Sequence, residues 1–132
     1  MSFDWRTYIE LARLLMERAA EIPASEACYR SVASRAYYGA YHLARDFARD
    51  ADDTVFSSDE HRSLQNHFLN HPYKVKKRLG NNLRKLHQYR KKADYDDELF
   101  EAPINTAAKA LAKVKTILQD LDRLTGGAKS TL

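Results

Sequence analysis

Apolar residues recur at helical spacing along most of this chain, and the breaks between the runs fall at proline, glycine or polar clusters. Three long runs cover residues 5–22, 25–49 and 103–124, with Ser25 as the expected N-cap of the second. In the last run the apolar side chains repeat every three to four residues, at Ala107, Leu111, Val114, Ile117, Leu118 and Leu121. The pattern therefore predicts three long amphipathic helices.

Two shorter helices are expected between the second and third long runs. Ser57 followed by Glu60 resembles a capping box and predicts a helix that runs to about residue 70. Pro72 cannot continue a helix, and Gly80 suggests a second interruption after it. The next helix is accordingly expected over residues 81–93, before an acidic turn at 94–98.

The whole chain of 132 residues lacks the alternating pattern of strands and any internal repeat. Its connections are short enough to join antiparallel neighbours. We therefore predict an all-α, up-down helical bundle of four to five helices. It is expected to form one domain over residues 1–124, followed by a disordered tail at 125–132.

Several classes of function are set aside by what the sequence lacks. Cys28 is the single cysteine, and no apolar run approaches the roughly 20 residues that a membrane span needs. The N-terminal residues do not resemble a secretory leader, so a cytoplasmic location is expected. Neither a glycine-rich phosphate loop nor a cysteine pair or HExxH metal spacing is present, and we expect neither a cofactor nor a metal.

The net charge of +4 hides a strong segregation along the chain. The segment from Glu60 to Lys92 holds ten lysines or arginines and one acid, which makes it +9 and leaves −5 for the remainder. Four of the five histidines lie in the same segment. A polyanion is the natural partner of such a segment, although basic helices are often only solvated faces.

The most distinctive local feature is the pairing of Arg35 with His42. Seven residues are nearly two helical turns, so the two side chains differ by only about 20° around the axis. An arginine fork can hold a phosphate, and an imidazole can carry a proton at neutral pH. RNA or a nucleotide is the ligand that this stripe would suit, while a purely structural role stays open.

Residues 30–42 (RSVASRAYYGAYH) and 90–96 (RKKADYD) together resemble the HEPN family, the higher eukaryote and prokaryote nucleotide-binding domain. The resemblance covers roughly residues 5–121 and is of the small stand-alone prokaryotic type. It implies a helical bundle, often a homodimer, commonly encoded beside a nucleotidyltransferase in toxin and antitoxin pairs. Many members are metal-independent endoribonucleases, and an Arg followed by a His after four to six residues is their catalytic motif.

Two pairs in this chain match that spacing, Arg35 with His42 and Arg62 with His67. The second pair is about 140° apart around a helix, so the first is the expected catalytic pair. Arg35 would stabilise charge on the phosphorane, and His42 would transfer a proton as the 2′-hydroxyl of RNA attacks. One histidine does not easily serve as both acid and base, so a second copy of the chain is expected to supply another.

The remaining candidate residues are defined by their position relative to this pair and to the basic segment. RNA or phosphate binding is expected of Tyr38, Arg45, Arg49, Lys74, Lys76, Lys77, Arg78 and Arg84. Structural roles are expected of Arg90, Asp94 and Tyr95, with Asp94 orienting Arg35 and Tyr95 packed at the end of the bundle. The alternative function is a noncatalytic nucleotide- or RNA-binding module that partners a nucleotidyltransferase.

Overall fold

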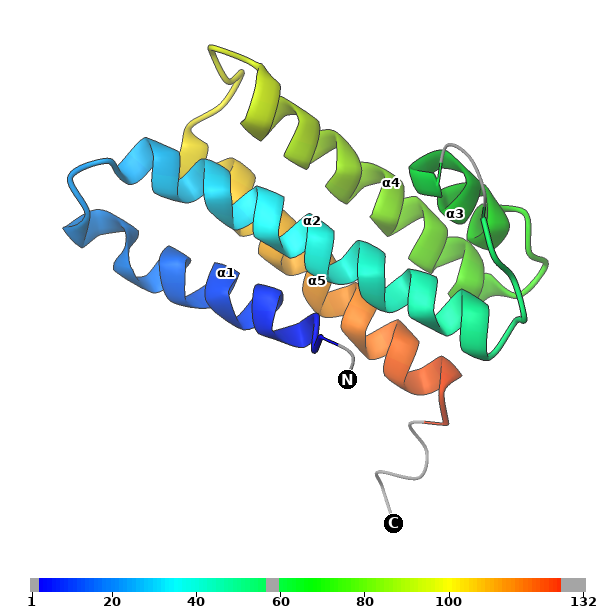
Figure 1. Cartoon of the computed structure of the whole chain (residues 1–132). Coiled ribbons are helices and arrows are strands. Elements are labelled where there is room, and N and C mark those ends of the chain that lie inside the picture. The colour runs from blue at the N-terminus through cyan, green and yellow to red at the C-terminus, as the bar shows by residue number, and fades with distance from the viewer. Residues whose placement is uncertain (1–2, 57–59, 127–132) are drawn as a thin grey trace.

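The computed structural model describes residues 3–56 and 60–126, and over this part of the chain it contains helices and no β-strand. The elements are α1 (Arg6–Arg18), the short 3-10 turn η1 (Ala19–Glu21), α2 (Ser25–Asp50), α3 (Glu60–Leu69), α4 (Lys74–Tyr95) and α5 (Pro103–Leu124). The predicted all-α helical bundle is confirmed (Figure 1). No helix of the described residues is both long and apolar enough to cross a membrane.

Helix α2 lies at the centre of the bundle and packs against α1, α4 and α5 (Figure 1). Small side chains allow close approaches to α2, because buried alanines recur every three to four residues along one stripe of the helix, at Ala33, Ala36, Ala40, Ala44 and Ala48. The short helix α3 packs mainly against α4. The basic segment of residues 60–92 is therefore divided between two helices that pack against each other.

Gly39 sets the distance between α1 and α2. A Cβ atom at this position would lie 2.7 Å from Ile9 Cγ1 and 3.1 Å from the carbonyl oxygen of Trp5. Only hydrogen fits there, so the first turn of α1 lies directly against the middle of α2. This contact decides the environment of the neighbouring His42.

The prediction that Gly80 interrupts a helix is wrong, since α4 runs without a break from Lys74 to Tyr95. A Cβ at Gly80 would lie 2.7 Å from the backbone nitrogen of Leu69 and 3.0 Å from the carbonyl oxygen of Gln65. The glycine serves a close helix crossing between α3 and α4 rather than a turn. The expected break near Pro72 is present, between the end of α3 and the start of α4.

The helix ends differ from the prediction in two further details. Ser25 is the first residue of α2 and Ala24 is its N-cap, and the chain after Arg18 tightens into η1 rather than continuing as an α-helix to residue 22. The predicted capping box at Ser57 and most of the predicted C-terminal tail lie outside the described residues. The last helix ends at Leu124, and Gly126 follows with a φ of 88°.

Arg30 ties the C-terminal end of α4 to α2. Its guanidinium donates to the carbonyl oxygens of Ala93, Asp96 and Asp97 at 3.0, 2.5 and 3.0 Å. Carbonyl groups at the end of a helix lack partners within the helix, and this side chain satisfies that of Ala93 together with two carbonyl groups of the chain just after the helix. The acidic turn that follows α4 is thereby held against the body of the bundle.

Candidate functional site

Arg35 and His42 share the face of α2 that meets α1. The guanidinium carbon of Arg35 lies 5.5 Å from the centre of the Tyr8 ring. The imidazole of His42 stacks on the indole of Trp5, with 3.5 Å between the ring centres and 10° between the planes. Aromatic side chains of α1 and of its N-cap therefore cover the predicted catalytic pair.

This cover changes the chemistry of His42. Its Nδ1 atom is buried and has no hydrogen-bond partner among the described residues. Burial, with a smaller contribution from Arg45, lowers the pKa of His42 to about 4. The ring is neutral at pH 7, so it does not hold the proton that a general acid needs in this conformation.

The basic segment does not present all its cations as one surface, because Lys76 and Arg78 pair with carboxylates and Arg90 is buried. Lys76 lies 2.9 Å from Asp52, and Arg78 makes two hydrogen bonds, of 2.9 and 2.5 Å, to the buried carboxylate of Asp120. Lys74 and Lys77 are exposed at the start of α4.

Arg45 and Arg49 on α2 line a small pocket of about 190 Å³, and both contact acids. Arg49 pairs with Asp50 at 2.8 Å and with Asp46 at 3.4 Å. Arg45 lies 3.7 Å from Glu60 and 4.0 Å from Asp46. A phosphate would have to compete with these carboxylates for either guanidinium.

Arg90 is almost completely buried in a cage of tyrosine rings. The rings of Tyr37, Tyr38 and Tyr95 have their centres 5.6, 5.0 and 5.8 Å from its guanidinium carbon. Such contacts stabilise a desolvated cation through the negative face of each ring. Tyr38 therefore contacts Arg90 on α4, away from the α1 side chains that cover Arg35 and His42.

Asp94 was predicted to orient Arg35, but the structure places its carboxylate against other side chains. Its carboxylate accepts a hydrogen bond from Ser34 Oγ at 3.3 Å and lies 3.7 Å from Arg90, whereas Arg35 lies against Tyr8. Tyr95 is 73% exposed, so it edges the arginine cage rather than packing into the end of the bundle.

The clearest concave polar feature is a cavity of about 550 Å³ between α3 and α4, which we call the basic pocket. Its lining consists of Arg62, Gln65, Asn66, Leu69, Arg84, His87 and Lys91. Among the described residues, this lining holds three permanent cations and no carboxylate. Of the residues predicted to bind phosphate, Arg84 is the one that this pocket includes.

A cluster of four stacked rings adjoins the basic pocket. His87 stacks on His61 at 4.9 Å and on Tyr37 at 4.7 Å between ring centres, and Tyr41 stacks on His61 at 4.4 Å. We call these four side chains the ring cluster. It joins α2, α3 and α4, so the orientation of His87 in the pocket is fixed by the packing of three helices.

The sequence analysis did not predict the basic pocket, although the spacing of its lining residues is visible in the sequence. On α4, Arg84, His87 and Lys91 recur at spacings of three and four residues, which places them on one helix face. On α3, Arg62, Gln65, Asn66 and Leu69 do the same. That these two faces oppose each other follows from the close crossing of α3 and α4 and is not visible in either segment alone.

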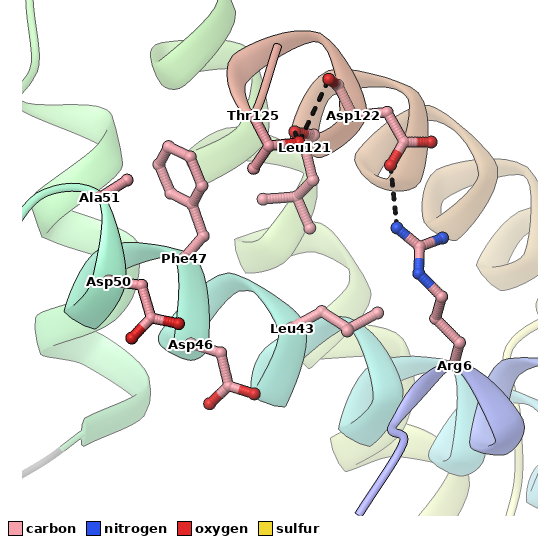
Figure 2. Close-up of a pocket in the computed structure, with 9 residues that line it drawn as sticks. All are labelled: Arg6, Leu43, Asp46, Phe47, Asp50, Ala51, Leu121, Asp122 and Thr125. Carbon is pink, nitrogen blue, oxygen red and sulfur yellow. Dashed lines mark hydrogen bonds and ion pairs between the residues drawn. The ribbon is translucent and has the colours of Figure 1, made fainter. Parts of the chain in front are cut away.

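A second hollow, of about 410 Å³, lies between the C-terminal halves of α2 and α5 (Figure 2). Its apolar residues include Leu43, Phe47 and Leu121. Three carboxylates also line it, but each has an arginine partner: Asp46 and Asp50 pair with Arg49, and Asp122 with Arg6 at 2.8 Å. The charges that this hollow presents to a ligand are therefore already compensated.

Comparison with known proteins returned no match. No protein-family model matches the chain, no curated protein matches its sequence, and no solved structure matches it. Within the described residues no group of three or more histidine, cysteine or acidic side chains is placed to hold a metal ion. The assignment of function therefore depends on the geometry of the pocket and the ring cluster.

Proposed function

We propose that this protein binds RNA through phosphate groups held in the basic pocket between α3 and α4. The observation that carries the proposal is the lining of that pocket, in which Arg62, Arg84 and Lys91 come together around one cavity. Guanidinium groups bind phosphate oxygens in a bidentate manner, and lysine adds a point charge. A cavity of this size suits one nucleotide-sized group of a longer chain.

The amide side chains in the same pocket extend the proposal from binding of phosphate to recognition of the sugar or base. Gln65 and Asn66 line the pocket beside the cations, and both carry donors and acceptors. Phosphate contacts provide affinity that does not depend on sequence, whereas amides can contact sugar or base edges. Single-stranded RNA, whose bases and phosphates are both accessible, is the form that a pocket between two helices would accept.

The test is RNA binding by a variant in which the three cations are removed as Arg62→Gln, Arg84→Gln and Lys91→Gln. Removing one cation that binds a phosphate reduces the slope of log affinity against log salt by about 0.7 for single-stranded RNA. We expect weaker binding of a single-stranded oligonucleotide and a slope lower by about 2. The measurement is fluorescence anisotropy between low and physiological salt.

The matched control removes the same charge elsewhere, as Arg13→Gln, Arg18→Gln and Lys115→Gln. These side chains are exposed on α1 and α5, away from the basic pocket. The control is expected to retain most of the wild-type salt slope. Equal reductions in the two triple variants would show that net charge alone drives binding, and the pocket would then have no special role.

A second candidate function is that of a HEPN-type toxin, a metal-independent endoribonuclease that acts as a homodimer and is countered by a nucleotidyltransferase antitoxin. The observation that favours it is the placement of Arg35 and His42 on one face of α2, against the same helix. Because Trp5 covers His42, cleavage at this pair requires the first turn of α1 to move. The two candidates share RNA as the partner and differ in which face of the bundle meets it.

Cleavage is tested with cellular RNA in EDTA, using the wild type and the variant His42→Phe. Phenylalanine preserves a ring that stacks on Trp5 and removes both ring nitrogens. The variant therefore removes proton transfer while it retains the packing on which folding depends. Cleavage by the wild type only, with 2′,3′-cyclic phosphate ends, would support the endoribonuclease. Binding in the basic pocket with no cleavage by either protein would support the noncatalytic module.

A further inference from the structure

Two rows of cations run along the solvent-facing side of α4, and we call them the cation rows. Seven residues return a helix to nearly the same face, about 20° short of two full turns. The first row repeats at this interval through Lys77, Arg84 and Lys91, and the second through Arg78, Lys85 and Lys92. Lys85 is partly buried and the other five are exposed. Both rows therefore lie on the side of α4 that α2, α3 and α5 leave uncovered.

Little negative charge compensates the cation rows. Helix α4 contains nine lysines or arginines and a single acid. Within the part of the chain that the structure describes, Arg78 is the row member that forms an ion pair, with Asp120. Glu101 interacts electrostatically with Lys92, but its ion pair is with Lys109 at 2.8 Å. Exposed helices that serve only as solvated faces usually alternate acids and bases at spacings of three or four residues, and α4 does not.

The cations at the start of α4 also oppose the stability of the helix. Lys74, Lys76 and Lys77 lie in its first turn, which holds no acid, and the N-cap Tyr73 makes no side-chain hydrogen bond. The N-terminus of a helix carries a partial positive charge, so cations there are unfavourable. Lys76 is compensated by a carboxylate, whereas Lys74 and Lys77 are exposed. A local arrangement that works against the fold without a packing gain is typical of a binding surface.

Two amide side chains lie between the cation rows. Asn81 and Gln88 are also seven residues apart, and their positions around α4 fall between those of the two rows. Arg84 extends over this strip, because its Nη2 donates to Oδ1 of Asn81 at 2.7 Å. A strand lying between the rows would meet cations on both sides and amide donors and acceptors beneath it.

The cation rows have the length of a short stretch of nucleic acid. Lys77 and Lys91 are separated by a rise of about 21 Å along the helix axis. A stacked strand advances about 3.4 Å per nucleotide, so this rise corresponds to about six nucleotides. The acidic turn at 94–98 follows directly, and its carboxylates would repel a polyanion. The favourable surface for a polyanion therefore ends at Lys92.

We infer that the cation rows form a track that binds the backbone of single-stranded RNA over about six nucleotides, with the strand running along α4. The track is continuous with the basic pocket, since Arg84 and Lys91 belong to the first row and also line the pocket. One nucleotide would occupy the pocket while its neighbours lie on the rows. The identity of the polyanion as RNA rests on the proposed function, and the binding of an extended strand rests on the rows alone.

The track is tested with oligouridylates between about two and twelve nucleotides long, whose binding to the full-length protein is measured by fluorescence anisotropy. The affinity of the wild type is expected to rise with length up to about six nucleotides and to change little beyond that. The row variant Lys77→Gln, Lys85→Gln and Lys92→Gln removes three cations that do not line the pocket. Its salt slope with the longest strand should be lower by about 2, and its binding of the dinucleotide should be unchanged.

The matched control is again Arg13→Gln, Arg18→Gln and Lys115→Gln, which removes the same charge and should keep the wild-type dependence on length. Thermal unfolding checks that the row variant is folded. It should be at least as stable as the wild type, because it removes a cation from the first turn of α4. Equal salt slopes in the two triple variants would overturn the track.

The remaining outcomes separate the track from the pocket. An affinity that is already complete with the dinucleotide would overturn the track and leave the pocket as the binding site. If Arg62→Gln leaves dinucleotide binding unchanged while the row variant loses its salt slope, the pocket fails and the track stands. Binding of no oligonucleotide at any length would overturn both. Polyglutamate bound as tightly as RNA of equal charge would overturn the assignment of the track to RNA and favour an acidic protein partner.

Discussion

The imidazole of His42 lies flat on the indole of Trp5, 3.5 Å away, with its Nδ1 buried and unbonded among the described residues. A residue that looked like a proton carrier in the sequence is therefore part of the contact between α1 and α2. This relationship has a measurable consequence for the pH dependence of folding.

The folded state is expected to lose stability as the pH falls from about 6.5 toward 4. Burial lowers the pKa of His42 to about 4 in the folded state, so the unfolded chain binds this proton first and acid favours unfolding. Solvent screens the partly buried ring, so the loss attributable to His42 is on the order of 1–2 kcal/mol when complete. Urea denaturation of the wild type and of His42→Phe at pH 4.5 and pH 7 measures it. The same pH dependence in both proteins would show that other groups are responsible.

The close crossing at Gly80 predicts that alanine is harmful in the middle of a helix. Gly80→Ala gains about 1 kcal/mol of helix propensity. Its Cβ, however, meets the backbone of α3 at 2.7 Å, and overpacking costs about 1–3 kcal/mol. We expect a net loss of stability, whereas the exposed control Lys77→Ala should change stability by less than about 0.5 kcal/mol. Thermal unfolding distinguishes the two, and a stabilised Gly80→Ala protein would contradict the crossing.

Asp52 is expected to tether the loop after α2. Its two carboxylate oxygens contact His67 Nε2 at 2.8 Å and Lys76 Nζ at 2.9 Å, and all three side chains are mostly buried. Asp52→Asn leaves Lys76 without its counter-charge and should cost about 2–3 kcal/mol. Because the pKa of Asp52 is lowered in the folded state, its stabilising contribution is present above the ordinary pKa of an aspartate and disappears as the pH falls below it.

The control for this tether is the next residue, Asp53, which is exposed and has a φ of 52°. Asparagine tolerates that left-handed conformation, so Asp53→Asn should be nearly neutral. Chemical denaturation at pH 7 compares the two variants. Similar stabilities would mean that the contacts of Asp52 contribute nothing beyond those of a surface acid.

Arg30 is expected to protect the end of α4 from local opening. Arg30→Lys keeps the charge but replaces the two guanidinium nitrogens that reach these carbonyl groups by one ammonium nitrogen, so part of the hydrogen bonding should be lost and the last turn should fray at a cost of about 1–2 kcal/mol. Amide hydrogen exchange at Asp96, whose N–H bonds to Lys92, reports that opening. The exposed ion-pair partner provides the control, because Glu26→Gln removes only a surface contact. Unchanged exchange in Arg30→Lys would remove the capping role.

Particular residues show how much of the fold and of the candidate site the sequence predicts. Periodicity located the long helices because their apolar faces repeat with the helical period, and α5 begins and ends at the predicted residues. The role of Gly80 was predicted wrongly, since a glycine that permits a close helix crossing and a glycine that ends a helix look identical in sequence. The role of Lys76 could not be predicted either, because its partner Asp52 lies in the loop after α2 and no local sequence pattern reveals that contact.

The sequence by itself determined an all-helical chain with its charge concentrated in α3 and α4, because helical period and charge are properties of neighbouring residues. The tertiary structure alone decided which of those charges pair with described acids and which share one cavity. Packing buries His42 under Trp5 and pairs Lys76 and Arg78 with acids, while the crossing at Gly80 brings Arg62 opposite Lys91. Exposure and pairing depend on contacts between residues far apart in the chain, and the folded arrangement of the helices sets them.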